Sequence, residues 1–323
     1  MSTDKKHQTE KISPALLVAN ITLLAFVISF SLMVYQSHRG SRTVSVVPPA
    51  PSTNTHMYDN LALHAKSVYV LDVSTGKVLY AKDAQTPRPL ASLTKVMTAI
   101  TALSLLPKNT TITVTKDFLS EEGDSGLYVN ERWSFKNLLD FSLLVSSNDG
   151  MRSIASVAGA FGLPQTGGQP NYGIGLKDFI TKMNTLSTSL DLKTMKFNNE
   201  TGLDISSNED GGVGSAEDMT HLMQYALTKY PDLMEVTRDQ TLDISSLDKK
   251  HIAKNTDTVI SDIPDPIASK TGYTDNAGGN LVVAFDAGIN HPVIITVLGS
   301  TYDGRFSDME LLASSTLSYL RNN

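Results

Sequence analysis

Ser92-Leu93-Thr94-Lys95 follows a proline-rich segment, Thr86 to Ala91, and precedes an apolar run, Val96 to Leu106, that predicts a helix. Residues three positions apart share one face of a helix, so the lysine amine can reach the serine oxygen. A serine hydroxyl is a weak nucleophile that needs an adjacent base, and a partly desolvated lysine can serve as that base. The four-residue pattern is common by chance, so its meaning depends on the rest of the chain.

Two further short motifs lie at the ends of predicted secondary-structure elements. Ser146-Ser147-Asn148 lies where a predicted helix, Phe135 to Val145, ends. Lys270-Thr271-Gly272 begins a strand-like stretch that continues to Thr274. In isolation the first would be a helix end or turn, and the second an edge-strand lysine before a turn. Together with Ser92 and Lys95, in this order, they indicate an enzyme with an active-site serine.

This set resembles the S-x-x-K, S-D-N and K-T-G motifs of class A β-lactamases and penicillin-binding proteins. The chain is most similar to the serine-type D-Ala-D-Ala carboxypeptidases among the low-molecular-mass penicillin-binding proteins. The similarity covers roughly residues 60 to 320. The segments that carry it are Ala91 to Thr98, Asn130-Glu131-Arg132, Leu143 to Asp149, Asn199 to Asp204, Ser215 to Met219, Lys270 to Thr274, and Ala277-Gly278-Gly279.

The resemblance implies roles for the residues of the first two motifs. Ser92 would be the nucleophile that forms an acyl-enzyme, and Lys95 the base for acylation. Ser146 would relay a proton toward the leaving amine. Asn148 would hold both the substrate's amide and the lysine.

For the third motif, Lys270 would bring positive charge into the cleft, and Thr271 would offer its hydroxyl to the substrate's terminal carboxylate. Gly272 would leave room for a peptide to lie along the strand edge. The oxyanion hole would consist of the N–H groups of Ser92 and Tyr273.

The chain departs from the family pattern at one place. Many relatives have Asn-Pro-His-Gly-Leu where this chain has Asn199-Glu200-Thr201-Gly202-Leu203. The missing histidine leaves the deacylating residue open. Glu200 would either position water or be an ordinary loop acid.

Composition excludes several other classes. The 323-residue chain carries a formal net charge of −6 and shows no basic block, which argues against a nucleic-acid partner. It has no cysteine, which excludes disulfides and thiolate metal sites and suits an exported protein. Its seven histidines lack metal-ligand spacing, so neither a metal nor another cofactor is expected.

The N-terminal region predicts a membrane anchor. Residues 15–35 are mostly apolar, and at about 1.5 Å per residue they would span roughly 31 Å, enough for a bilayer core. A cleaved signal peptide is the alternative, but the stretch is long for one and lacks an A-x-A site. We therefore expect a short cytoplasmic tail (1–14), the anchor (15–35), a Pro/Ser/Thr-rich linker (36–57) and an extracytoplasmic catalytic domain (58–323).

Strand patterns at both ends of that domain surround a mostly helical middle, Ser92 to about Tyr230, which predicts an α+β fold. The resemblance implies an antiparallel sheet from both chain ends, flanked by helices, with an inserted helical subdomain. The expected strands are Ser67 to Val73, Val78 to Ala81, Ser269 to Thr274, Asn280 to Phe285 and Pro292 to Gly299, with a last helix from Ser307 to about Tyr319.

The expected function is that of an envelope-anchored, single-pass membrane D,D-carboxypeptidase. Its partners would be peptidoglycan stem peptides, with β-lactam antibiotics as covalent inhibitors. D,D-endopeptidase action on cross-links is a close variant. A β-lactamase is a different class, disfavoured because no Glu-x-x-x-Asn loop precedes Lys270 at the class A spacing. A penicillin-binding sensor or wall-binding module without turnover is the non-enzymatic alternative.

Overall fold

The computed structural model describes residues 58–123, 125–165 and 167–322. All of them belong to one compact unit, residues 51–323. The expected cytoplasmic tail, membrane anchor and linker (1–14, 15–35 and 36–57) lie outside the described residues. Within the described ranges, every helix is too short or too polar to span a bilayer.

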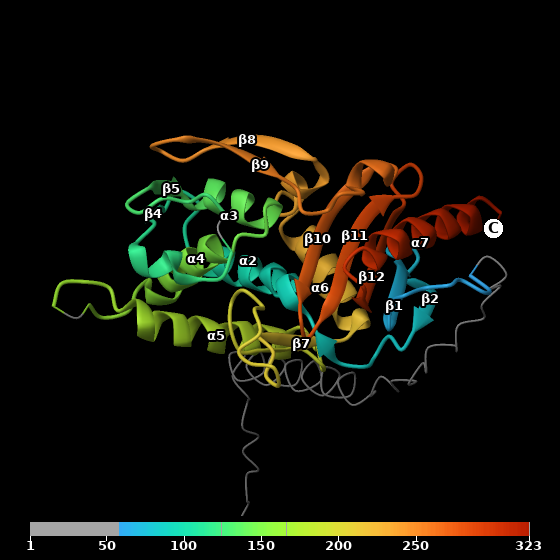
Figure 1. The fold of residues 1–323 in the computed structure, drawn as a ribbon, viewed down its shortest axis with the longest axis horizontal. Coiled ribbons are helices and arrows are strands. Elements are labelled where there is room, and N and C mark those ends of the chain that lie inside the picture. Colours follow the sequence, from blue (N-terminus) through green and yellow to red (C-terminus); the bar gives the residue numbers. More distant parts are fainter. Residues whose placement is uncertain (1–57, 124, 166, 323) are drawn as a thin grey trace, which may run out of the picture. The chain divides into compact units, whose positions relative to one another are not determined.

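A five-stranded antiparallel sheet is built from both ends of this unit (Figure 1). The strand order is β10-β11-β12-β1-β2, so the last strand of the chain pairs with the first, with Ser67 opposite Leu298. This sheet and the helices around it confirm the predicted α+β class. The strands are β1 (Ser67–Asp72), β2 (Lys77–Lys82), β10 (Pro266–Thr274), β11 (Gly278–Asp286) and β12 (Pro292–Ser300).

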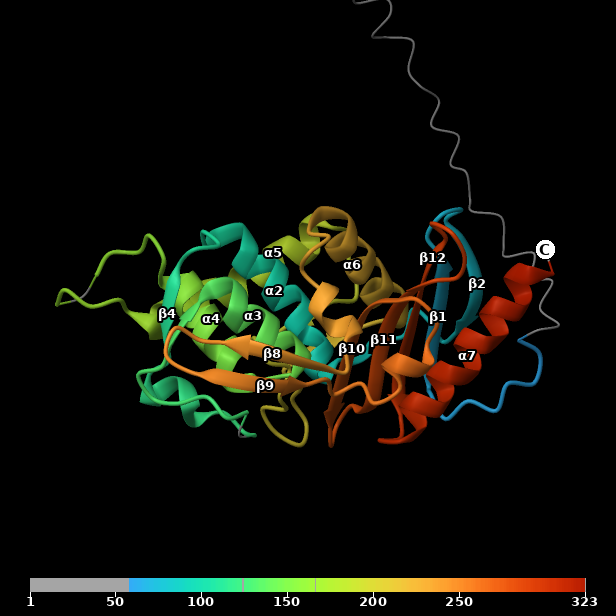
Figure 2. The same cartoon turned by 90° about the horizontal axis from the view of Figure 1, so that it is seen from above.

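Helices cover both faces of the sheet. Alternate residues of β1 enter different hydrophobic clusters, Val68 and Val70 on the face toward α7, Tyr69 and Leu71 on the face toward α6. Figures 1 and 2 show α6 (Ala216–Lys229) and α7 (Gly304–Arg321) on opposite sides of the strands. Because both faces are buried, the central strands are apolar almost throughout.

The start of α7 differs from the sequence prediction. The helix begins at Gly304, three residues before the expected start at Ser307. The N–H of Gly304 donates to Thr301 Oγ1 (2.9 Å), and the N–H of Arg305 donates to the carbonyl of Thr301 (3.2 Å). These bonds begin the helix one turn earlier and bring Arg305 into its first turn.

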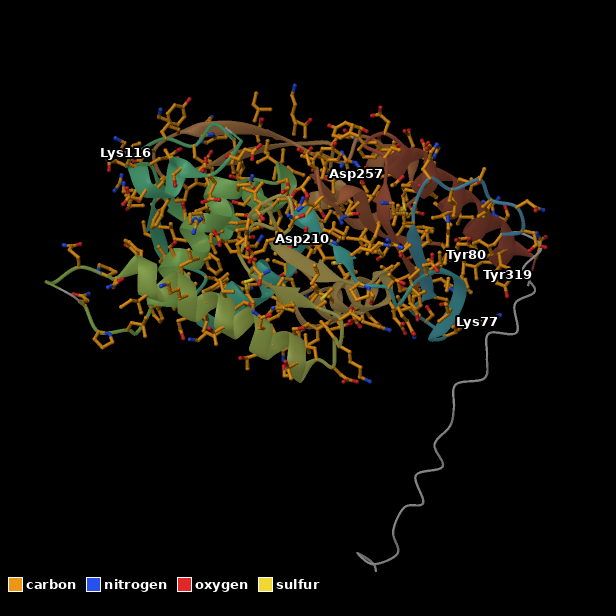
Figure 3. The ribbon with its side chains drawn as sticks, turned by 60° about the horizontal axis from the view of Figure 1, so that its bottom comes forward. Lys77, Tyr80, Lys116, Asp210, Asp257 and Tyr319 are labelled. Carbon is orange, nitrogen blue, oxygen red and sulfur yellow. The ribbon has the colours of Figure 1, made fainter. Side chains whose placement is uncertain are left out.

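Polar and aromatic contacts tie the far end of α7 to β2. Lys77 Nζ donates to the hydroxyl of Tyr319 at 2.6 Å, and Figure 3 shows both side chains near Tyr80. The ring of Tyr58 stacks on that of Tyr80 at a centroid distance of 5.2 Å. The ring of Tyr58 also lies 6.1 Å from that of Tyr319, so these contacts hold the C-terminal end of α7 against β2.

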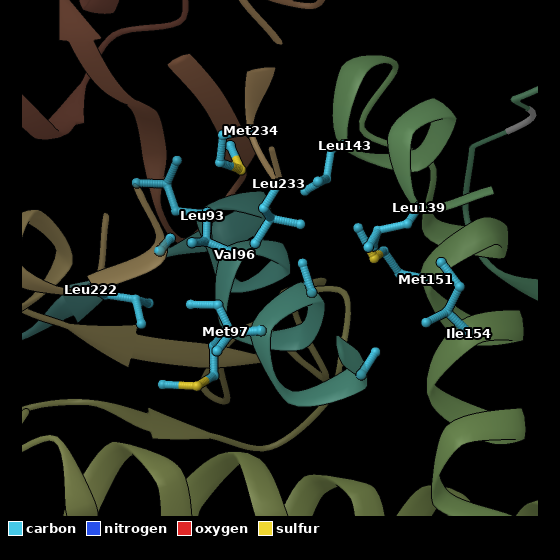
Figure 4. Packing of buried hydrophobic residues seen from close by; sticks show 14 of the residues in the cluster. Leu93, Val96, Met97, Leu139, Leu143, Met151, Ile154, Leu222, Leu233 and Met234 are labelled. Carbon is cyan, nitrogen blue, oxygen red and sulfur yellow. The ribbon is translucent and has the colours of Figure 1, made fainter. Parts of the chain in front are cut away.

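Four helices from the middle of the chain form the part beside the sheet. They are α2 (Thr94–Leu105), α3 (Phe135–Leu144), α4 (Asn148–Ala160) and α5 (Tyr172–Ser189). Figure 4 shows the core between three of them, with Met97 from α2, Leu139 from α3 and Ile154 from α4. Ser147 caps α4, because its Oγ accepts the N–H of Gly150 at 2.9 Å.

Short ladders complete the fold. The hairpin of β8 (Thr241–Ser245) and β9 (Lys250–Lys254) was not predicted from the sequence. It is attached to β5 because the N–H of Leu247 donates to the carbonyl of Arg132 at 2.7 Å. The remaining elements are β3 (Arg88–Pro89), β4 (Thr111–Thr113), β5 (Arg132–Ser134), β6 (Lys196–Phe197), β7 (Gly212–Gly214), and the 3-10 helices η2 (Ala91–Leu93), η3 (Lys116–Ser120), η4 (Glu235–Arg238) and η5 (Ile260–Asp262).

Candidate active site

The Ser92 hydroxyl lies in the tight turn that precedes α2. Ser92 is the middle residue of η2, and its neighbour Ala91 has a positive φ of 48°. The N–H of Leu90 donates to the carbonyl of Gly212 at 2.8 Å, which fixes the entry to the turn. Ser92 Oγ lies 2.8 Å from Lys95 Nζ, so the structure brings together the two side chains that the first motif predicted.

Lys95 Nζ has three polar neighbours, and two of them are fixed acceptors. It donates to Asn148 Oδ1 at 2.7 Å and to the carbonyl of Thr201 at 2.8 Å. The orientation of the Asn148 amide is settled by its Nδ2, which donates to the carbonyl of Glu122 at 2.6 Å. A neutral amine has two N–H groups and one lone pair, so the lone pair is left facing Ser92 Oγ.

Burial changes the protonation of Lys95. Its side chain is fully buried at the start of α2. Desolvation lowers the pKa of Lys95 from 10.5 to about 7, although the carboxylates of Glu200 and Glu121 act in the opposite direction. The lowered pKa favours the neutral amine, which is the form that can accept a proton.

An ion-pair cluster lies behind Lys95. Arg152 of α4 pairs with both Glu121 and Glu200, and its Nε lies 3.0 Å from Glu200 Oε1. Glu200 is almost fully buried, and desolvation raises the pKa of its carboxyl group. That contact is close enough for an ion pair, but neither oxygen of Glu200 has a hydrogen bond of good geometry within the described part of the chain. The sequence prediction left Glu200 open and missed Arg152, whose place four residues after Asn148 on α4 was the available signal.

Ser146 and Lys270 form a second contact across the cleft. Ser146 has a φ of 59°, which turns the chain between α3 and α4. Lys270 Nζ donates to Ser146 Oγ at 2.8 Å and to the carbonyl of Thr271 at 2.9 Å. Desolvation lowers the pKa of Lys270 well below its ordinary value, and the charge of Lys95 adds to that effect.

The third motif lies against the turn of the first. A Cβ added to Gly272 would come within 2.9 Å of the Leu90 carbonyl oxygen and 3.1 Å of the Ser92 nitrogen. Only glycine therefore allows β10 to approach the Ser92 turn this closely. Thr271 Oγ1 lies 2.6 Å from Thr256 Oγ1, a partner that no motif indicated. Tyr273 follows at the strand's outer edge with 45% of its surface exposed.

A cavity of about 360 Å³ opens beside these groups. Its lining includes Ser146 and Asn148 from the second motif, Ser125 from the loop above it, and Ile252 and Lys254 from β9. The unpredicted hairpin thus supplies one wall of the cavity. In the ranges that the structure describes, no group of histidine and acidic side chains could hold a metal ion.

Comparisons with known proteins agree with this arrangement. Residues 53–301 match the family model described as D-alanyl-D-alanine carboxypeptidase. D-alanyl-D-alanine carboxypeptidase DacF of Bacillus subtilis is 32% identical over 254 residues, which cover 75% of this chain and 59% of that protein. A D-alanyl-D-alanine endopeptidase of Pseudomonas aeruginosa is 30% identical over 74% of this chain and 72% of its own length.

Solved structures show the same fold. A point mutant of the Streptomyces K15 DD-transpeptidase aligns with a TM-score of 0.69 and 26% identity, covering 80% of this chain and 99% of that chain. Penicillin-binding protein D2 of Listeria monocytogenes, in its ampicillin-bound form, aligns with a TM-score of 0.66 and 25% identity, covering 79% and 98%.

Proposed function

The chain belongs to the D-alanyl-D-alanine carboxypeptidase family of serine peptidases, and we propose that it removes the terminal D-alanine from peptidoglycan stem peptides through an acyl-enzyme on Ser92. One observation carries this assignment of the nucleophile: Nζ of the buried Lys95, whose pKa is lowered to about 7, lies 2.8 Å from Ser92 Oγ. No metal or cofactor takes part in the proposed reaction.

Acylation uses the two hydroxyls and the amine. Ser92 Oγ bonds to the carbonyl carbon of the penultimate D-alanine, while its proton passes to Lys95 Nζ. The C–N bond to the terminal D-alanine then breaks, and the proton reaches the leaving nitrogen through Ser146, whose hydroxyl Lys270 orients at 2.8 Å. The developing oxyanion is held by the backbone N–H groups of Ser92 and Tyr273.

Binding of the terminal D-alanine uses the third motif. The Thr271 hydroxyl, paired with that of Thr256, donates to the terminal carboxylate. A carboxylate in the cleft also favours the protonated form of Lys270, which offsets the desolvation that lowers its pKa. On the other side of the scissile bond, Asn148 holds the peptide amide.

Deacylation returns the enzyme to its starting state. Water attacks the ester carbon, its proton passes through Lys95 to Ser92 Oγ, and the shortened peptide leaves as a carboxylic acid. Thr201 occupies the position of the family's histidine and contacts Lys95 through its carbonyl oxygen at 2.8 Å. We assign Glu200 to positioning within the Arg152 cluster rather than to water activation.

One assay distinguishes the candidate functions. The purified chain is incubated with a D-Ala-D-Ala-terminated peptide, with a cross-linked muropeptide dimer, and with benzylpenicillin. Released D-alanine with slow penicillin turnover is expected. Preferred cleavage of the dimer would indicate an endopeptidase, as several relatives are named. Rapid penicillin hydrolysis would indicate a β-lactamase, and a stable adduct without peptide cleavage would indicate a sensor.

We also propose a location in the cell membrane with the catalytic domain outside the cytoplasm. Two features support it: the apolar stretch 15–35, which lies outside the described residues, and the extracytoplasmic site of the proposed substrate. Fractionation of cells that produce the full chain tests this, with the membrane pellet as the expected fraction. Recovery in the cytosol would contradict it.

A further inference from the structure

A buried arginine reaches the strand that carries the third motif. Arg305, in the first turn of α7, is 4% exposed. One terminal nitrogen of its guanidinium donates to the carbonyl of Gly272 at 2.9 Å. Helix α7 is thus joined to Gly272 of β10, the glycine that lies against the Ser92 turn.

The carbonyl of Gly272 and the N–H of Tyr273 belong to one planar peptide unit. In a trans peptide these two groups point in opposite directions. Arg305 lies beside β11, because a Cβ added to Gly279 of that strand would come within 3.4 Å of the Arg305 Cβ. The Gly272 carbonyl is therefore directed to the β11 side, and the N–H of Tyr273 to the free side of β10. That strand is the edge of the five-stranded sheet, and the Ser92 turn lies beside it.

We propose that Arg305 is a positioning residue for the oxyanion hole, holding the Gly272–Tyr273 peptide in plane and strengthening its N–H as a donor to the oxyanion. This inference rests on the proposed function. A cation at the carbonyl oxygen draws electron density through the conjugated amide, so the N–H on the opposite side becomes a stronger donor. No bond is made or broken by Arg305 itself.

The surroundings of Arg305 support a role for its charge. Its guanidinium lies over the rings of Tyr302 and Phe306, at 4.5 and 4.6 Å from their centroids, and its pKa is lowered chiefly by desolvation. Burying a cation costs stability, and a neutral donor would bind one carbonyl at less cost. The cost is understandable if the charge acts on a group that is needed only when an oxyanion develops.

The position of Arg305 separates this role from direct substrate binding. The contact reaches the substrate side only through a peptide bond, so the charge affects the transition state more than the bound ligand. Removal of Arg305 is therefore expected to slow acylation and leave non-covalent affinity unchanged. If the side chain instead bound the ligand carboxylate, its loss would weaken non-covalent affinity.

The test compares Arg305→Met, Arg305→Lys and Asp308→Asn in the full chain. Asp308 lies on the same helix and accepts the N–H of Ala65 at 2.8 Å, so Asp308→Asn loosens α7 without touching Gly272. Three quantities are measured with benzylpenicillin: the acylation rate constant, the non-covalent dissociation constant, and the infrared stretch of the ¹³C-labelled ester carbonyl in the acyl-enzyme. The stretch reports the strength of hydrogen bonding to the ester oxygen.

We expect Arg305→Met to slow acylation by about tenfold, less than the 10²–10³ loss of a whole oxyanion donor, and to move the stretch to higher frequency. Arg305→Lys keeps the charge, so its acylation rate and its carbonyl stretch should lie between those of the unaltered chain and those of Arg305→Met. Asp308→Asn should lower the melting temperature but leave rate and stretch unchanged.

Unchanged acylation and stretch in folded Arg305→Met would overturn the inference, and so would a loss confined to the dissociation constant. If Arg305→Met fails to fold, Arg305→Lys decides instead: an acylation rate and a carbonyl stretch equal to those of the unaltered chain would overturn the inference. The proposed function is judged separately, on the unaltered chain: without an acyl-enzyme or D-alanine release there, it fails and the inference fails with it.

Discussion

Glu200 Oε1 lies 3.0 Å from Nε of Arg152, joining the segment after β6 to helix α4 behind Lys95. Arg152 also pairs with Glu121. The next residue, Glu122, accepts the side-chain N–H of Asn148 with its carbonyl oxygen. The cluster therefore connects three segments that surround Lys95, and each of them contributes to its position or its protonation.

The first prediction concerns the pH dependence of acylation. Only neutral Lys95 accepts the serine proton, so the rate should rise with pH through about 7 and level off above. The Glu200 carboxylate favours the protonated lysine, so Glu200→Gln should lower the pKa of Lys95 and move this limb to lower pH. The measurement is the second-order rate of penicillin acylation between pH 5 and pH 9.

Glu209→Gln serves as the matched control, because Glu209 is exposed and its side chain is far less enclosed than that of Glu200. The acylation rate of Glu209→Gln should rise over the same pH range as that of the unaltered chain. If the pH dependence of acylation in Glu200→Gln were identical to that of the unaltered chain, either the titrating group would not be Lys95 or the Glu200 carboxylate would not act on it.

A second prediction concerns stability. Arg152→Leu removes the cation beside the buried Glu200 and should cost about 3–5 kcal/mol of unfolding free energy at neutral pH. Without Arg152 the folded-state pKa of Glu200 rises further above its unfolded value. Protons then bind the folded state more tightly, so the loss relative to the unaltered chain should grow as pH rises from 5 to 8. Denaturant unfolding at both pH values measures it, and a loss independent of pH would be inconsistent with this cause.

Much of the fold was predictable because its patterns are local. The strands Pro292–Ser300 and Gly278–Asp286 are long apolar runs, and Ser215 is a typical helix cap at the start of α6, where its Oγ accepts the N–H of Asp218 at 3.1 Å. The hairpin β8–β9 was missed because its strands are short and largely exposed, and its contact with Arg132 joins residues that are distant in the sequence.

The residues of the candidate site also fall into those that the sequence predicted and those that it did not. The motif residues were found because the chemistry requires particular residue types at short spacings. Thr256 and Arg305 were missed because each contacts a residue of the third motif from outside it, and only the folded chain brings them together. Arg152 was missed because its partners, Glu121 and Glu200, are distant from it in the sequence. Gly272 was expected to make room for a peptide, whereas the structure shows that it also makes room for the Ser92 turn.

The third prediction tests that close approach. In Gly272→Ala the new methyl group meets the Leu90 carbonyl and the Ser92 nitrogen, so β10 must move away from Ser92. Acylation should fall on the order of 10- to 100-fold, as displacements of about 1 Å do in positioned sites. Gly173→Ala, at an exposed position near the start of α5 with the nearest neighbour of the new methyl group 3.8 Å away, should leave acylation unchanged. Equal rates in the two variants would contradict the account of Gly272.

The fourth prediction concerns the terminal carboxylate. Thr271→Val removes the hydroxyl that is proposed to bind it, and a lost hydrogen bond to a charged group corresponds to roughly a 10- to 100-fold rise in KM. Thr256→Val leaves that hydroxyl in place but unsupported and should have a smaller effect. Steady-state kinetics with D-Ala-D-Ala peptides, with and without terminal amidation, provide the measurement. A penalty that persists for the amidated peptide would assign Thr271 another role.

The most direct test of the central claim locates the covalent bond. The full chain and its Ser92→Ala variant are treated with benzylpenicillin, digested, and mapped by mass spectrometry, with circular dichroism to verify folding. The account predicts one penicilloyl group on Ser92 of the unaltered chain and none on the folded variant. A penicilloyl group on another residue, or equal labelling of Ser92→Ala, would contradict it.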